Sequence, residues 1–287
     1  MTRGVPAGEG GYGDAPTAPL PWHDAGLPPA RPPEPAADWG TERRRMPRWL
    51  RRVLIAVLAI ALAGALAFAG LMVGTPSVST APLLAQAFDQ AHRAPYPGPL
   101  VPSRFAAALV ATEDHRFYSE PGFDPIAIGR VIAGRLTGQP DQGGATLYQQ
   151  LAKMLYTPSG SGPSVEAEQI ILGIKLDLSY SKAQILRLYA DVAYFGHGYY
   201  GLAQASCGYF RVPPAGLTWA QAALLAGLVQ APTADNPIAH FTLARARQAH
   251  VLGRLVATGK LTQVQASRAY RAPLHLVGGP GTGCAAR

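Results

Sequence analysis

The chain has 287 residues, 48% of them hydrophobic, which is enough to bury the core of one substantial domain and excludes a disordered protein. Its net charge of +8 is unevenly placed, because residues 1–42 hold two Arg against six acids while residues 43–52 hold six Arg and no acid. The other 17 bases and 11 acids do not form the clustered stripe of a nucleic-acid-binding protein. We therefore expect an anionic lipid surface or a phosphorylated substrate as partner, and no nucleic acid.

The N-terminal part of the sequence predicts a tail and a membrane anchor. Residues 1–42 carry nine of the 27 prolines and seven glycines without a periodic apolar pattern, which predicts a disordered tail. Residues 43–52 form a basic juxtamembrane segment, and residues 53–73 form an uncharged run of 21 residues, long enough for a single transmembrane helix and too long for a signal-peptide core. Because the Arg cluster precedes this run, the N-terminus is expected in the cytoplasm and the rest of the chain outside.

After a linker predicted over residues 74–97, residues 98–276 read as an all-α domain. Three helix starts show a Ser or Thr followed three residues later by Gln, the capping-box pattern: Ser181 with Gln184, Thr218 with Gln221 and Thr262 with Gln265. Residues 277–287 are expected to be a disordered end. Cys207 and Cys284 are too few for a disulfide scaffold, and we expect one buried thiol and one loose thiol rather than a bridge.

The segment from residue 146 to residue 155 shows two faces at helical spacing. One face is apolar, with Leu147, Leu151, Met154 and Leu155, and the other carries Thr146, Gln149, Gln150 and Lys153. A merely solvated face would hold several charges, whereas this one holds a single Lys. The polar stripe is therefore a candidate binding surface.

Four stretches, in order along the chain, together resemble the family 51 peptidoglycan glycosyltransferases. They are ATEDHRFYSEPGFD (111–124), GGATLYQQLAK (143–153), YSKAQILRLYADVAYFGHGYYGLAQAS (180–206) and LTWAQAALLAGLVQAPTADNP (217–237). The resemblance implies an all-α, lysozyme-like domain on a single N-terminal transmembrane helix, which polymerises lipid II into β-1,4 glycan strands outside the cytoplasmic membrane. It also implies lipid II, the nascent glycan and the membrane as partners, with other cell wall synthases or division proteins as further ones.

The resemblance assigns Glu113 as the general base that takes the proton of the acceptor 4-hydroxyl, because a sugar hydroxyl is a poor nucleophile until that proton is removed. The leaving group is a lipid pyrophosphate, whose developing negative charge calls for Lys, Arg or amide donors. The residues assigned to substrate binding on this basis are Asp114, Phe117, Thr146, Gln149, Gln150, Lys153 and Gln169. Between the first two stretches, the apolar residues Ile126, Ile128, Val131 and Ile132 match the part of the family that dips into the bilayer.

The chain departs from the family pattern at several positions. Gln169 stands where the family has its second Glu, and Ser161, Val165 and Glu166 stand where it usually has bases. The family's divalent cation, Mg or Mn, is an expected cofactor, but Gln169 removes one of its carboxylate ligands, and we assign no residue as a metal ligand. Glu120 replaces a usual His, and a second carboxylate near Glu113 is expected to raise the pKa of Glu113.

Two further departures and two rival functions follow from the same comparison. Ala145 and Tyr148 replace the family's hydroxyl residues in the second stretch, and Arg187 and Asp191 replace its Glu and Asn in the third.

The losses favour a catalytically impaired scaffold that binds lipid II or glycan for cell wall synthases. A lytic enzyme with a lone Glu acid is the other alternative, although such an enzyme has no pyrophosphate for the polar stripe to hold.

Overall fold

The computed structural model describes residues 46–124, 134, 137–138, 145–279, 281 and 284. The predicted tail at residues 1–42 and the apolar patch around Ile126 and Val131 lie outside the described residues. The chain divides after Ile55 into two compact units, and every helix except the first lies wholly in the larger unit, Ala56–Arg287.

Helix α1 (Arg48–Gly74) contains the whole predicted membrane span. It has 27 residues, none of them buried, and it is the one helix among the described residues that is long and apolar enough to cross a membrane. At 1.5 Å per residue it is about 40 Å long, against roughly 30 Å for the hydrocarbon core of a bilayer. The extra length lies at its N-terminal end, where Arg48, Arg51 and Arg52 precede the apolar run.

The described part of the larger unit is built from helices, which confirms the all-α prediction for these residues; the one β-type pairing described there is an isolated bridge between Tyr194 and Tyr200. Two short 3-10 helices span Val78–Thr80 and Pro214–Gly216. The α-helices after α1 are α2 (Ala81–Ala91), α3 (Ser103–Glu113), α5 (Leu147–Tyr156), α6 (Pro163–Ser179), α7 (Lys182–Val192), α8 (Gly201–Phe210), α9 (Trp219–Leu228), α10 (Phe241–Ala257) and α11 (Gln263–Arg271).

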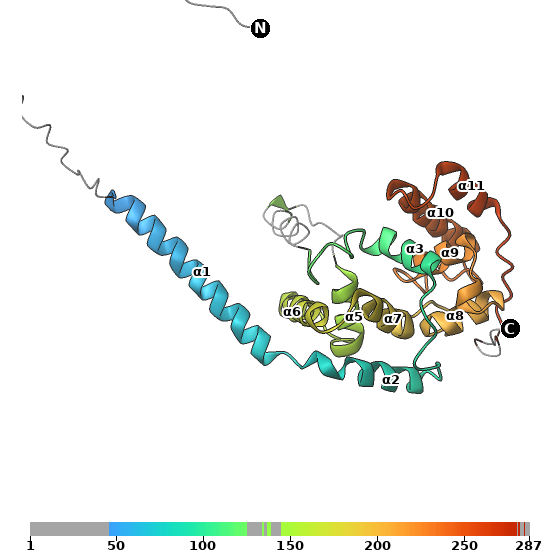
Figure 1. Cartoon of the computed structure of the whole chain (residues 1–287), viewed down its shortest axis with the longest axis horizontal. Coiled ribbons are helices and arrows are strands. Elements are labelled where there is room, and N and C mark those ends of the chain that lie inside the picture. The colour runs from blue at the N-terminus through green and yellow to red at the C-terminus, as the bar shows by residue number, and fades with distance from the viewer. Residues whose placement is uncertain are drawn as a thin grey trace, which may run out of the picture. The chain divides into compact units, whose positions relative to one another are not determined.

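Helix α9 forms the centre of one group of helices. Its sequence is apolar all round, as expected of a core helix, and every residue except Trp219 is buried. It packs against α3 and α10, and Gly227 permits the close approach of α10, because a Cβ there would lie 3.2 Å from Cβ of Arg247. A second group joins α5 with α6 and α7 (Figure 1). The C-terminal end of α3 and the polar face of α5 bring the two groups together.

Capping boxes begin four of these helices. The three that the sequence predicts, at Ser181, Thr218 and Thr262, are confirmed. A fourth, Thr146 with Gln149, begins α5. Each box satisfies two backbone amides of the first helical turn that have no partner within the helix.

The predicted linker at residues 74–97 is corrected, because it contains α2 and contacts of the folded domain. Ala81, Ala85 and Asp89 of α2 are buried. Lys175 of α6 donates its Nζ to the carbonyl of Thr75 at 2.9 Å, so the chain is held to α6 directly after α1. The Pro and Ala content that suggests a linker is equally compatible with a helix, since proline is tolerated in the first helical turn and Ala is the best helix former.

The described part of the C-terminal end is also held in place, against the expectation of a loose end with free thiols. The backbone amides of Val277 and Gly279 donate to the carbonyls of Tyr209 and Gly208, each at 2.9 Å. Cys207 of α8 and Cys284 form a disulfide. The two cysteines are 77 residues apart in sequence, so only the return of the chain end to α8 brings them together.

Candidate active site

Glu113 is the last residue of α3, and its carboxylate belongs to a chain of hydrogen bonds through three helices. Nε2 of Gln150, in α5, donates to Oε2 of Glu113 at 3.1 Å. The hydroxyl of Tyr189, in α7, donates to Oε1 of Gln150 at 2.8 Å. Tyr189 is buried, so the Gln150 amide is fixed from the protein interior and its donor end faces the carboxylate.

The surroundings of Glu113 set its affinity for a proton. Burial raises its pKa above the ordinary value, and the hydrogen bond from Gln150 and the charge of Arg247 pull it down, while Asp114 pushes it up. A base with a raised pKa binds the transferred proton more strongly, which favours proton abstraction near neutral pH. A carboxylate with these surroundings has the properties that a general base needs.

Arg247 is a basic residue near Glu113 that lies outside the four recognisable stretches. It belongs to α10, and its Nε lies 3.5 Å from Oδ2 of Asp235. The packing of α10 on α3 and α9 brings it to the site. No local pattern in the sequence distinguishes it from the other bases of α10.

Glu120 does not act on Glu113 in the way that the sequence suggests. Burial and the neighbouring Asp114 raise the pKa of Glu120 to about 7, whereas the acid that raises the pKa of Glu113 is Asp114. Neither carboxylate oxygen of Glu120 has a hydrogen-bond donor among the described residues. The predicted repulsion between Glu120 and Glu113 is thus replaced by a buried contact between Glu120 and Asp114.

Three residues assigned to substrate binding make structural contacts within the domain. Oδ2 of Asp114 accepts the backbone amide of Leu147 at 3.0 Å, which fixes the first turn of α5 beside Glu113. Thr146 is buried, and its hydroxyl both accepts from Gln149 N and donates to the carbonyl of Gly122. Phe117 is completely buried against Tyr148, so its ring cannot reach a substrate.

The remaining three residues of the polar stripe have different surroundings. Gln150 donates a hydrogen bond to Glu113 and so positions its carboxylate. The family resemblance assigns Gln150 to substrate binding and does not include this contact. Gln149 is half-buried, and its Oε1 accepts from Thr146 N in the capping box. Lys153 is exposed in the last turn of α5, one turn beyond Gln149 and Gln150, and its side chain is available to an anionic ligand.

Gln169 lies at the same end of α5 as Lys153. It is half-buried in α6, and its Nε2 donates to Oγ1 of Thr157, the residue after α5, at 2.9 Å. The amide therefore ties the two helices together. A carboxylate at this position could accept from Thr157 but could not donate to it.

A divalent cation held by side chains does not fit the donors described here. Within the ranges that the structure describes, no three His, Cys, Asp or Glu residues come together in a way that could hold a metal ion. One oxygen of Glu113 and one of Asp114 already accept hydrogen bonds, from Gln150 and from Leu147, and Gln169 offers only one side-chain oxygen. No catalytic step is therefore derived through a metal.

Most of the helical domain is similar to known proteins. The family described as transglycosylase matches residues 82–256. A protein of Cupriavidus necator, named as a candidate transglycosylase, is 34% identical over 61% of this chain and 76% of its own length. Penicillin-binding protein 1A of Neisseria flavescens is 37% identical over 58% of this chain, and penicillin-binding protein 1F of Bacillus subtilis is 33% identical over 61%.

The matched part is 21% of the length of the Neisseria protein and 25% of that of the Bacillus protein. A crystal structure of penicillin-binding protein 1A from Haemophilus influenzae aligns with 62% of this chain and 17% of its own, at 21% identity and a TM-score of 0.37. The transglycosylase pattern begins at residue 82, inside α2, which agrees with the correction of the linker. Because that pattern covers more than half of the chain, the chain belongs to the transglycosylase family, the family 51 peptidoglycan glycosyltransferases that its motifs resemble.

Proposed function

We propose that this chain is a peptidoglycan glycosyltransferase that polymerises lipid II into β-1,4 glycan strands. The observation that carries the proposal is the carboxylate of Glu113, held at the end of α3 by Gln150, which is itself held by the buried Tyr189. A solvated surface acid would have neither a fixed donor nor a raised pKa. This arrangement is what a base needs to be in place before its substrate arrives.

In the proposed reaction, Glu113 takes the proton of the acceptor 4-hydroxyl while that oxygen attacks C1 of the donor sugar. The new C1–O bond forms as the bond from C1 to the pyrophosphate oxygen breaks, and the configuration at C1 inverts. The electron pair leaves with the lipid pyrophosphate. Lys153 lies one helical turn from Gln150, about 5–6 Å at the level of Cβ atoms, and would neutralise this charge as it develops.

Membrane anchoring belongs to the same proposal. α1 has the length and composition of a membrane-spanning helix, and Arg48, Arg51 and Arg52 stand at its N-terminal end. By the positive-inside rule the N-terminus would be cytoplasmic and the catalytic domain external. Reporter fusions at the two ends are expected to give opposite protease protection, with the C-terminal reporter digested from outside; digestion of the N-terminal reporter instead would reverse the proposed orientation.

A second candidate function rests on the region around Gln169. An amide replaces the usual carboxylate there, and it is used in a hydrogen bond with Thr157. Ser161, Val165 and Glu166 stand where the family usually has bases. These features favour a protein that binds lipid II or glycan without turning it over and serves as a scaffold for cell wall synthases.

One experiment separates the two functions: polymerisation of labelled lipid II by the detergent-solubilised protein, with lipid II binding measured on the same preparation. Turnover by the wild type that is lost in Glu113→Gln supports the enzyme and rules out the scaffold. Binding without turnover in the wild type, weakened by Lys153→Ala, supports the scaffold. Absence of both turnover and binding would contradict both functions.

A further inference from the structure

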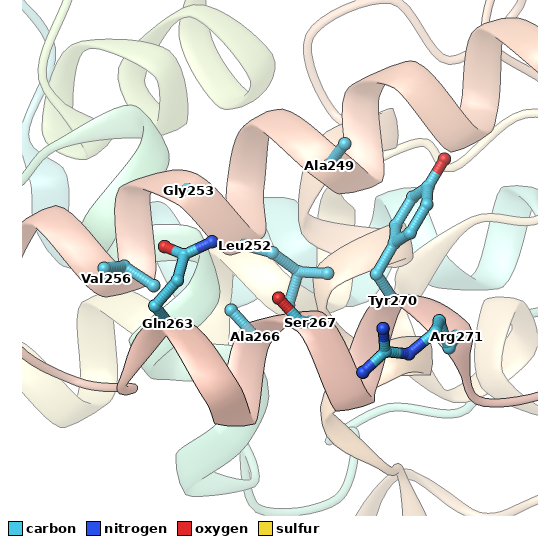
Figure 2. A pocket seen from close by; sticks show the side chains of 9 residues that line it. All are labelled: Ala249, Leu252, Gly253, Val256, Gln263, Ala266, Ser267, Tyr270 and Arg271. Carbon is cyan, nitrogen blue, oxygen red and sulfur yellow. The ribbon is translucent and has the colours of Figure 1, made fainter.

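A hollow of about 310 Å³ lies between α10 and α11, at a distance in sequence from Glu113, Gln150 and Lys153. Figure 2 shows Tyr270 and Arg271 at one end and Gln263 and Val256 at the other. The complete lining is Ala249, Leu252, Gly253, Val256, Gln263, Ala266, Ser267, Tyr270 and Arg271. Since a water molecule occupies about 30 Å³ in the liquid, the space suits a large side chain rather than isolated solvent.

The floor of the hollow is apolar and its depth depends on a glycine. Leu252 and Ala266 are buried beneath it. Gly253 is exposed in the middle of α10, where a Cβ would meet no heavy atom within 4 Å. Glycine weakens a helix interior, and here it leaves open the space that any larger residue would fill.

The hollow is separate from the candidate active site. α10 packs into the domain through buried residues that include Ala244, Gln248 and Leu255. Ala249, Gly253 and Val256 are other positions of the same helix, and together with residues of α11 they line the hollow. No residue of the hollow belongs to the chain of hydrogen bonds at Glu113.

One wall of the hollow is held in a fixed position. The guanidinium of Arg245 lies 3.9 Å from the centre of the Tyr270 ring and donates to the carbonyl of Tyr270 at 2.6 Å. The same guanidinium donates to Oε1 of Gln248, a buried residue of α10. The end of α11 is thereby fastened to α10, and the hollow is formed before any ligand binds.

The C-terminal part of the chain, which contains the hollow, has charged side chains of one sign. Residues 236–287 hold seven Lys and Arg residues and no Asp or Glu, whereas residues 53–235 hold ten bases and eleven acids. Arg268 and Arg271 are exposed in the last turn of α11, and in the part of the chain that the structure describes neither pairs with a carboxylate. The end of a helix favours bases, but that preference does not explain the lack of acids over 52 residues.

We propose that this hollow binds an acidic peptide segment of a partner protein. One large apolar side chain of the segment would enter over Gly253 and contact Leu252 and Ala266, and its carboxylates would pair with Arg271 and Arg268. A peptide fits these features better than an anionic polymer, because the apolar floor calls for an apolar anchor. A small number of buried apolar and arginine side chains commonly supply most of the binding energy of an interface.

The test begins with random dodecapeptide display on the solubilised full chain, followed by anisotropy measurements with the enriched peptides. We expect enriched sequences that combine a large apolar residue with several acids. Their Kd is expected to rise at least tenfold in Gly253→Leu, which fills the hollow, and at least tenfold in Arg271→Glu. High salt is expected to weaken binding further, because exposed charge pairs are screened.

Matched controls keep these outcomes distinct. Ala246→Leu adds the same side chain at an exposed position of α10 outside the hollow and is expected to leave Kd unchanged. Gly253→Leu is expected to melt no lower than the wild type, since leucine is the better helix former, and to polymerise lipid II as the wild type does. Because the Kd of the peptides is measured without turnover, failure of the catalytic proposal would not affect this test.

Three results would overturn the proposal. The first is that no peptide family is enriched over an uncoated surface. The second is that the enriched peptides bind Gly253→Leu as tightly as the wild type. The third is complete competition by polyglutamate or by phosphatidylglycerol vesicles, which would assign the basic surface to an anionic polymer or to lipid.

Discussion

Glu113 and Asp89 are both enclosed by this domain, and they differ in whether a hydrogen-bond donor reaches the carboxylate. At the end of α3, Glu113 receives a hydrogen bond from Gln150 and the favourable charge of Arg247. In α2, Asp89 is completely buried, and neither of its oxygens has a donor among the described residues. Burial and the nearby Asp191 raise the pKa of Asp89 to about 7.

The difference distinguishes a carboxylate that is suited to accept a proton from one that retains its own. A donor keeps a partly buried carboxylate ionised and ready to accept a proton, whereas a carboxyl without a donor is most stable when it retains its own proton. Asp191 lies between the two cases. Burial raises its pKa to about 6, and the backbone of Gly98 and the charge of Arg187 lower it. Arg187 and Asp191, which differ from the family pattern, thus belong to the group of buried charges around Asp89. They are not among the residues that contact Glu113.

The largest expected effect is the loss of polymerisation in Glu113→Gln. Removal of a general base lowers turnover by about 10²- to 10⁴-fold. The free energy of unfolding should change by less than about 1 kcal/mol, since the site is partly open to solvent and the isosteric amide fits the same space. Lipid II polymerisation and thermal melting check both parts, and retained polymerisation would show that Glu113 is not the base.

The donor to Glu113 is tested by Gln150→Leu. Turnover is expected to fall by roughly one order of magnitude. The pH profile of turnover tests separately whether Gln150 acts on the pKa of Glu113. Because the hydrogen bond from Gln150 lowers the pKa of Glu113, its loss should move the acidic limb of the profile to higher pH. Tyr189→Phe should move the limb in the same direction by less. An unmoved limb with lower turnover would mean that Gln150 contacts only the substrate.

The acid without a donor is tested by Asp89→Asn. Its pKa is raised from 3.8 to about 7, so between these values the folded protein keeps a proton that the unfolded chain has released. Stability therefore falls as pH rises through this window, and the loss persists above it. Asp89→Asn should stabilise the domain by on the order of 1 kcal/mol or more at about pH 8 and by little at about pH 4. Thermal melting at both pH values checks this, and equal melting of the variant and the wild type at about pH 8 would contradict it.

The smallest expected effect is that of Gln169→Glu. If the chain is an active enzyme, the restored carboxylate should raise turnover several-fold by organising the basic groups that hold the leaving group, about 1 kcal/mol in barrier height. The loss of the donor to Thr157 acts against this gain by loosening the contact of α6 with α5. Unchanged turnover together with a lower melting temperature would mean that Gln169 is structural.

Local sequence patterns predicted the parts of the fold that depend on neighbouring residues. The capping boxes at Ser181, Thr218 and Thr262 need only four residues each, and all three are present. The same pattern begins α5, but there Thr146 and Gln149 are also suitable for binding, and only their hydrogen bonds distinguish the two uses. Spacing along a helix identifies a face and does not say what the face contacts.

Long-range contacts decided the features that the sequence did not predict. Gln150 meets Glu113 across 37 residues, and Tyr189 meets Gln150 across 39. Glu120 is seven positions from Glu113, yet its charge is coupled to Asp114 because of how the turn after α3 folds. The effect of a carboxylate on its neighbours depends on distance in space and on burial, and the sequence gives neither.

The disulfide between Cys207 and Cys284 depends on the compartment in which the domain folds. Thiols stay reduced in the bacterial cytosol and pair in the periplasm or at the cell surface. Cells quenched in acid, dissolved in denaturant and treated with a maleimide polymer, with and without prior reduction, would therefore report on which side of the membrane the domain folds, without a fused reporter. A gel shift that appears only after reduction would mean that the domain matured outside, and a shift without reduction would place it in the cytosol.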